Sequence, residues 1–312
     1  MTKENGKFRL VTRSDFDGLV CAVLFKELGM IDEIKFVHPK DMQDGKIPIT
    51  ENDISTNLPY VPGAYMLFDH HLSETVRNKE RPPNYIIDPD AKSASRVVYN
   101  YYGGKERFTN VSDEMMIAVD KADSAQFTID EILKPQDWVL LNYLMDPRTG
   151  LGRFREFRIS NYQLMMDLID CCQKLTIKQI LDLPDVKERV LLYFEQEEKF
   201  KAQVHRCSSV HKNLIVLDLR KEEVINAGNR FIIYAMFPET NISIHCMMGF
   251  RNQNTVFATG KSIVNRTSKT NIGDLMLKYG GGGHANAGTC QIDHDKAEGV
   301  LKELITKITA DG

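Results

Sequence analysis

Strand-like and helix-like segments alternate along the first third of the chain. A short apolar, β-branched run at 8–12 is followed by the acidic turn SDFDG and then by apolar residues at helical spacing that end at Gly29. Further strand-like segments at 33–39 and 64–71 precede a helical pattern over 93–104. This alternation predicts an α/β fold built on a parallel sheet with short connections.

The pattern changes twice after this region. Charged residues and apolar stripes predict helices from about Asp137 to His205, and the segment 186–205 is typical of a helix that connects two domains. From about Asn213 the segments NLIVLDL, RFIIYAMF, ISIHCMMGF and TVFATG are strand-like, and IGDLMLKYG is helical. A smaller α+β domain is therefore expected after the helical region.

A length of 312 residues makes two domains the natural expectation. We expect a first domain over 1–190, a helical linker over 191–209 and a second domain over 210–312.

Composition excludes several classes of protein. A formal net charge of −3 does not favour coating of duplex nucleic acid, so an anionic substrate needs a local cluster or a metal. No stretch reaches the ~20 apolar residues of a membrane span, and MTKENGKFRL has no apolar run of signal-peptide length. The six cysteines show no CxxC spacing, which favours free thiols in a reducing compartment. A cytoplasmic protein is expected.

Acidic and histidine residues follow the predicted strands. In parallel sheets ligands bind at the carboxyl ends of the strands, so side chains from several strands meet at one edge. Carboxylate and imidazole are ligands for divalent ions, and a pair of ions about 3.5–4 Å apart can clamp a phosphate. The residues concerned are Asp15, Asp17, Asp53, Asp69, His70 and His71.

Each part of this set has a structural alternative. Asp15 and Asp17, two residues apart, point the same way on extended backbone, but Asp is also a common helix N-cap. The adjacent His70 and His71 end an apolar strand, where a metal is one of the partners that would account for them.

Four glycines precede His284 in YGGGGHANAGT. They supply no packing side chains, and they free backbone amides to point at an anion. A flexible linker is the alternative, but a helical pattern leads into the run and an apolar strand leads out of it.

SDFDG, NDIS, DHH and GGGGH, in this order, resemble the motifs of the DHH phosphoesterase superfamily. The resemblance covers roughly 8–127 and 215–295, and it points to the branch with a C-terminal DHHA1 domain. This branch includes nanoRNases, phosphoadenosine phosphate phosphatases, cyclic-dinucleotide phosphodiesterases and RecJ-type exonucleases. The resemblance implies a metal-binding DHH domain, a substrate-binding DHHA1 domain and two Mn²⁺ ions in the cleft between them, with Mg²⁺ or another divalent ion as the alternative.

The resemblance also assigns roles to residues of the first domain. Asp15 and Asp17 resemble ligands of one ion each, and Asp53 resembles the aspartate that bridges both ions. His70 and Asp123 resemble the remaining ligands.

Two further residues of the DHH motif would take part in catalysis. Asp69 would orient a histidine, and His71 would face the phosphate as a hydrogen-bond or proton donor. Asp120 is the alternative to Asp123 as a ligand.

One departure concerns the first metal site. Many members carry a histidine where this chain has Val11 or Arg13, so the site is one ligand short. His38 is a candidate substitute.

In the second domain the resemblance assigns substrate binding to the glycine amides and to two side chains. The residues are Arg251, Gly281, Gly282, Gly283 and His284. A surface arginine remains the alternative for Arg251.

Outside the motifs, DPRTGLGRFREFR interleaves arginines with aromatic residues: Arg148, Arg153, Phe154, Arg155, Phe157 and Arg158. Such a segment can hold single-stranded nucleotides, or it packs against an acidic surface.

The resulting prediction is a hydrolase of phosphate esters in nucleotides or short single-stranded oligonucleotides. An exopolyphosphatase or pyrophosphatase and a catalytically weakened nucleotide-binding protein are the alternatives. A homodimer is compatible with the sequence.

Overall fold

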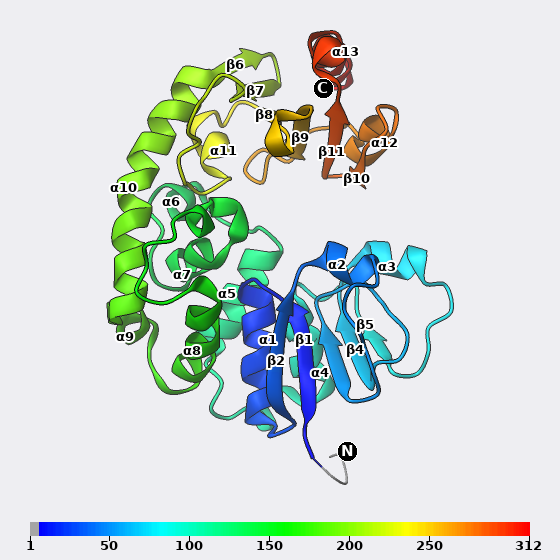
Figure 1. Ribbon diagram of the computed structural model, residues 1–312, viewed down its shortest axis with the longest axis vertical. Helices are drawn as coiled ribbons and strands as arrows, with labels where there is room; N and C mark the ends of the chain where they lie inside the picture. Colours follow the sequence, from blue (N-terminus) through cyan, green and yellow to red (C-terminus); the bar gives the residue numbers. More distant parts are fainter. Residues whose placement is uncertain (1–5) are drawn as a thin grey trace. The chain divides into compact units, whose positions relative to one another are not determined.

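The computed structural model describes residues 6–312, which form two compact units (Figure 1). Unit 1 comprises the chain up to Gln126 together with Pro135–Leu192, and unit 2 comprises Phe127–Lys134 together with Tyr193–Gly312. This division differs from the expected one in two respects: a short segment near residue 130 belongs to unit 2, and no separate linker follows residue 190.

Unit 1 is built on a five-stranded sheet in the order β2-β1-β3-β4-β5. Every neighbouring pair of strands is parallel, as the alternation of strands and helices predicts. The carboxyl ends of the strands therefore lie at one edge of the sheet. The strands are β1 (Phe8–Arg13), β2 (Ile31–Val37), β3 (Asp53–Thr56), β4 (Met66–Asp69) and β5 (Tyr85–Ile87).

The helix α1 (Phe16–Glu27) of unit 1 is apolar on nearly all sides and contacts β1 and β2 of the sheet and the helices α4, α5 and α8. A helix without a polar face is expected in a core. The other helices are α2 (Pro39–Gln43), α3 (Leu72–Arg77), α4 (Ala94–Tyr101), α5 (Asp113–Asp123), α7 (Asp137–Met145), α8 (Asn161–Lys174) and α9 (Ile177–Asp182), with 3₁₀ turns at Gly104–Glu106, Pro147–Thr149 and Leu151–Arg153.

The long helix α10 (Pro184–Cys207) corresponds to the predicted connecting helix. The boundary between the units falls between Leu192 and Tyr193, inside this helix. The covalent link at this point is therefore helical rather than a flexible loop.

Unit 2 contains a six-stranded sheet in the order β10-β11-β9-β8-β7-β6, in which β7 and β8 are parallel and the other pairs antiparallel. The strands are β6 (Ser208–His211), β7 (Leu214–Asp218), β8 (Ile242–Met248), β9 (Thr255–Lys261), β10 (Gly282–His284) and β11 (Ala287–Ile292). The helices are α6 (Ile129–Leu133), α11 (Ile232–Met236), α12 (Ile272–Leu277) and α13 (His294–Asp311), with a 3₁₀ turn at Phe250–Asn252.

One predicted strand of unit 2 is wrong. RFIIYAMF forms the helix α11, in which Ile232, Ile233, Tyr234 and Ala235 are buried. A short apolar run that is buried on all sides has no periodicity that separates strand from helix. Within the described residues, no helix is long and apolar enough to cross a membrane.

Candidate metal centre

Three of the predicted ligands come together in unit 1: Asp17, His70 and Asp123. Each offers one ligand atom, and these atoms lie within 4.8 Å of one another. Asp17 is in the first turn of α1, His70 follows β4, and Asp123 is the last residue of α5. Asp17 lies beyond the carboxyl end of β1 and His70 beyond that of β4, as the strand pattern predicts, and β3 separates these two strands in the sheet.

The start of α4 holds the Asp17 carboxylate. The backbone amides of Ala94 and Ser95 donate to its two oxygens at 2.9 and 2.8 Å, where the positive end of the helix dipole favours a negative charge. Burial nevertheless raises the pKa of Asp17 to about 7, the charge of Asp123 adds to this, and His70 opposes it. A buried carboxylate pair of this kind is stabilised by a cation between its members.

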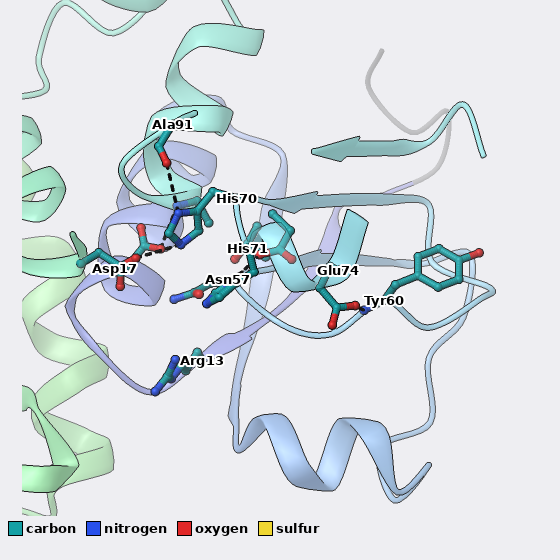
Figure 2. Close-up of polar contacts among 12 residues, drawn as sticks. Arg13, Asp17, Asn57, Tyr60, His70, His71, Glu74 and Ala91 are labelled. Carbon is teal, nitrogen blue, oxygen red and sulfur yellow. Dashed lines mark hydrogen bonds and ion pairs between the residues drawn. The ribbon is translucent and has the colours of Figure 1, made fainter. Parts of the chain in front are cut away.

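His70 is oriented by a backbone carbonyl. Its Nδ1 lies 3.2 Å from the carbonyl oxygen of Ala91, so Nδ1 carries the proton in this hydrogen bond (Figure 2). Nε2 is buried without a hydrogen bond of normal geometry, although Asp123 Oδ2 is 2.8 Å away. An imidazole whose Nδ1–H binds a carbonyl presents the Nε2 lone pair to a metal. The donor set therefore fits a divalent ion.

His71 is held differently from its neighbour. Its Nδ1 lies 2.7 Å from Oδ1 of Asp69, which is buried and also accepts a hydrogen bond of 3.4 Å from the Tyr85 hydroxyl. The His71 side chain is 37% exposed. Asp69 therefore orients His71, which is the kind of contact that was predicted for this aspartate. The contact uses Nδ1 of His71 and does not involve Nε2.

Asp15 lies outside the group of three. It is the N-cap of α1, and its Oδ1 accepts from the Gly18 amide at 3.0 Å and from Asn57 Nδ2 at 3.2 Å. Its Oδ2 lies 2.9 Å from Arg13 Nε. The alternative role as a cap is therefore present in the structure, and the role as a metal ligand stays a prediction.

Asp53 is not at this edge of the sheet, and its predicted bridging role is incompatible with its position. It is the first residue of β3, paired in register with Arg9, whereas Thr12 pairs with Thr56 at the other end. Three strand residues span about 10 Å. Asp53 instead forms an ion pair with Arg9 and accepts a hydrogen bond from the Thr50 amide.

Asn57, which directly follows β3, is the residue that sequence reasoning missed. It is buried, has φ +54° and contacts Asp15. Its position at the carboxyl end of β3, four residues after the selected aspartate, was the available signal.

Asp120 and His38, the two alternative metal ligands, form other contacts. Asp120 forms an ion pair with Arg96 and accepts from the Ser93 hydroxyl. His38 is an exposed N-cap, with Nδ1 accepting from the Lys40 amide at 3.1 Å. Neither belongs to the group around His70.

The glycine run ends α12 and begins the β10–β11 hairpin. A Cβ on Gly281 would lie 2.2 Å from the Thr289 carbonyl oxygen, and one on Gly283 would lie 2.3 Å from that of Ala287. These two glycines are required for close packing of backbone, whereas Gly282 has open space beside it. His284 is exposed at the end of β10.

Arg251 has φ +52°, and its guanidinium lies 5.1 Å from the ring of exposed Phe250. Its assignment to the substrate stays a prediction, as do those of His284 and the three glycines.

The arginine-rich segment is partly paired within unit 1. Arg148 binds Asp146, Arg158 binds Asp185, and Phe157 lies under Arg189, whose guanidinium is 3.9 Å from the ring centre. These contacts favour packing for Arg148, Phe157 and Arg158. Its role in nucleotide binding stays a prediction.

Comparison with known proteins gives a clear relationship. No family model and no curated protein matches the chain. Among solved structures, the pGpG-specific phosphodiesterase PggH from Vibrio cholerae is 63% identical, with a TM-score of 0.88, and the match covers 98% of this chain and 100% of PggH. The chain belongs to the DHH phosphoesterase superfamily. This DHH phosphoesterase is therefore a hydrolase of phosphate ester bonds.

A more distant match shows the shared fold. The exonuclease RecJ, in a structure bound to manganese, is 12% identical to this DHH phosphoesterase, with a TM-score of 0.52 over 100% of this chain and 92% of RecJ.

Proposed function

We propose that this DHH phosphoesterase hydrolyses pGpG or a closely similar short dinucleotide. The observation that carries the proposal is the 63% identity to PggH over the full length of both chains. Water attacks the bridging phosphorus, the bond from phosphorus to the leaving ribose oxygen breaks, and that oxygen gains a proton. The products of pGpG are two guanosine monophosphates.

The cofactor proposed is a divalent ion, with Mn²⁺ preferred and Mg²⁺ as the alternative. Two carboxylates and an imidazole suit such ions, and the buried Nε2 of His70 has no other hydrogen bond of normal geometry. A bound ion would neutralise charge on the phosphate and activate water. Asp17, His70 and Asp123 would hold it.

His71 is proposed as the group that supplies a proton to the leaving oxygen. Asp69 holds Nδ1, which fixes the ring and supports a protonated imidazole. Burial works against the charged form, but the hydrogen bond to Asp69 raises the pKa of His71. Positioned proton donors contribute roughly 10²–10⁴-fold to rates.

The test compares pGpG, a cyclic dinucleotide, 3′-phosphoadenosine 5′-phosphate and polyphosphate with Mn²⁺, Mg²⁺ or EDTA. We expect turnover of pGpG that requires a divalent ion and is lost in His70→Ala, whereas Arg107→Ala, an exposed arginine of unit 1, retains it. Preferred hydrolysis of polyphosphate would support the pyrophosphatase-like alternative. Tight nucleotide binding without hydrolysis would support the catalytically weakened one.

A cytoplasmic location and a homodimer stay predictions from the sequence.

A further inference from the structure

Arg13 stands beside the metal-binding group with part of its guanidinium uncommitted. It is the last residue of β1, its side chain is 31% exposed, and its Nε pairs with Asp15. Over residues 6–312, neither terminal nitrogen of Arg13 donates a hydrogen bond, and the closest approach to Asp15 is through Nε. Two parallel N–H donors are thus available at the same edge of the sheet as the proposed metal ligands, which is the arrangement that binds a phosphate best.

Asp15 has no oxygen left without a donor. Oδ1 accepts from the Gly18 amide and the Asn57 side chain, and Oδ2 pairs with Arg13. The carboxylate charge is therefore balanced by a guanidinium. A metal ion at Asp15 would have to displace that guanidinium.

Asn57 adds no charge that could hold a second ion. It is buried directly after β3, and its amide nitrogen donates to Asp15. The Arg13 guanidinium already balances the charge of Asp15, and Arg148 also interacts with Asp15 and Asp123. Little negative charge is therefore left for a second divalent ion beside Asp15.

The field of Arg13 reaches the metal ligands. Burial raises the pKa of Asp123, but the close contact with His70 and its charge, with smaller effects of His71 and Arg13, leave it lowered. Burial also raises the pKa of Asp15, and Arg13 is the largest opposing influence.

We propose that this centre binds one divalent ion, through Asp17, His70 and Asp123, and that the Arg13 guanidinium takes the place of a second cation by binding the substrate phosphate. The inference rests on the proposed function for its substrate, but its metal stoichiometry does not. Arg13 thereby becomes a catalytic residue, because its terminal nitrogens contact the phosphate on which charge develops.

The first experiment counts ions. Metal-free protein is titrated with Mn²⁺ by calorimetry, and the bound metal is measured by mass spectrometry. We expect one Mn²⁺ per chain in the wild type and in Arg13→Ala, and loss of that ion in His70→Ala. Two ions per wild-type chain would overturn the proposal, whatever the substrate proves to be.

The second experiment uses inorganic phosphate as the probe. In the Mn²⁺-loaded protein, Arg13→Ala should weaken phosphate binding by about tenfold or more, as expected for loss of a charge-assisted hydrogen-bond pair. Arg13→Lys should recover part of the affinity, and Arg107→Ala should match the wild type. Equal phosphate affinity in Arg13→Ala and the wild type would refute the role of Arg13.

A double variant tests whether these two side chains exclude the second ion. R13H with N57D places imidazole and carboxylate ligands beside Asp15, so we expect two Mn²⁺ per chain. A folded double variant that still binds one ion would contradict this explanation.

On pGpG, Arg13→Ala should lower kcat by about 10²–10³-fold with the metal content unchanged. If pGpG is not hydrolysed by the wild type, the proposed function fails while the ion count and phosphate affinity still decide the role of Arg13.

Discussion

Asp53 should matter for stability and not for the chemistry. Its side chain is 2% exposed and accepts from Arg9 Nε and Nη2 at 2.7 and 3.0 Å, and from the Thr50 amide at 2.7 Å. Removing one partner of a fully buried pair costs about 3–5 kcal/mol. Arg9 is 23% exposed, so water can solvate its charge in part. We expect Asp53→Ala to lower the free energy of unfolding by about 3 kcal/mol, at the low end of this range.

The chain offers a local probe for this measurement. Its single tryptophan, Trp138, is buried in unit 1 together with Asp53, so its fluorescence reports unfolding of that unit. With an m-value of roughly 2 kcal/mol/M, the urea midpoint in EDTA should fall by about 1.5 M. Adding Arg9→Ala should cost little more, because the pair is already broken.

Metal content and kcat decide between the two roles of Asp53. We expect both to stay within about twofold of the wild type under conditions where Asp53→Ala is folded, since the residue lies about 10 Å along the strand from the carboxyl end. A variant that keeps its urea midpoint but loses bound metal and turnover would show that Asp53 is a ligand and that the reasoning from strand register is wrong.

Other predictions concern the centre itself. His70→Ala should lower Mn²⁺ affinity by more than the roughly 10–100-fold cost of losing a supporting residue, as a calorimetric titration would show. Asp69→Asn and His71→Ala should each keep the metal and lower kcat, His71→Ala by about 10²-fold or more; metal loss in His71→Ala would reassign it as a ligand. His284→Ala should keep the metal and raise KM for a dinucleotide about tenfold, if it binds substrate. Burial lowers the pKa of His70, but the close contact with the Asp123 carboxylate and its charge raise it to about 9. Folding of the metal-free protein therefore favours protonated His70, and urea midpoints in EDTA should fall as pH rises from about 6.5 to about 9, less so in His70→Gln.

The sequence predicts those residues of the metal centre that follow a recognisable strand. Asp15 and Asp17 follow the apolar run at 8–11 within a few residues, and His70 follows the apolar run at 65–68, so these residues were expected beyond the carboxyl ends of their strands. The prediction for Asp53 is wrong because β3 begins at this residue and does not end there. A strand of four residues is too short for its sequence pattern to show where it begins and ends.

Tertiary contacts explain what sequence patterns could not show. Asn57 follows β3 and contacts Asp15 from 42 residues away, so no local pattern signals that contact. In the same way, nothing in the segment Phe127–Lys134 indicates that it belongs with residues more than sixty positions later in the chain.

That segment constrains how the protein can be made. The rings of Phe127 and Phe231 are tilted against each other with their centres 5.9 Å apart, and the carbonyl of Ile132 accepts a hydrogen bond from the Asn229 side chain. During synthesis at roughly 5–20 residues per second, α6 would wait about 5–20 s for these partners to leave the ribosome. A fragment that stops near His205 would lack Asn229 and Phe231, so Phe127 and Ile132, both buried in the full chain, would lose these partners. The first unit is therefore poorly suited to expression alone. Circular permutants or chimaeras should therefore keep α6 together with unit 2, to which it belongs.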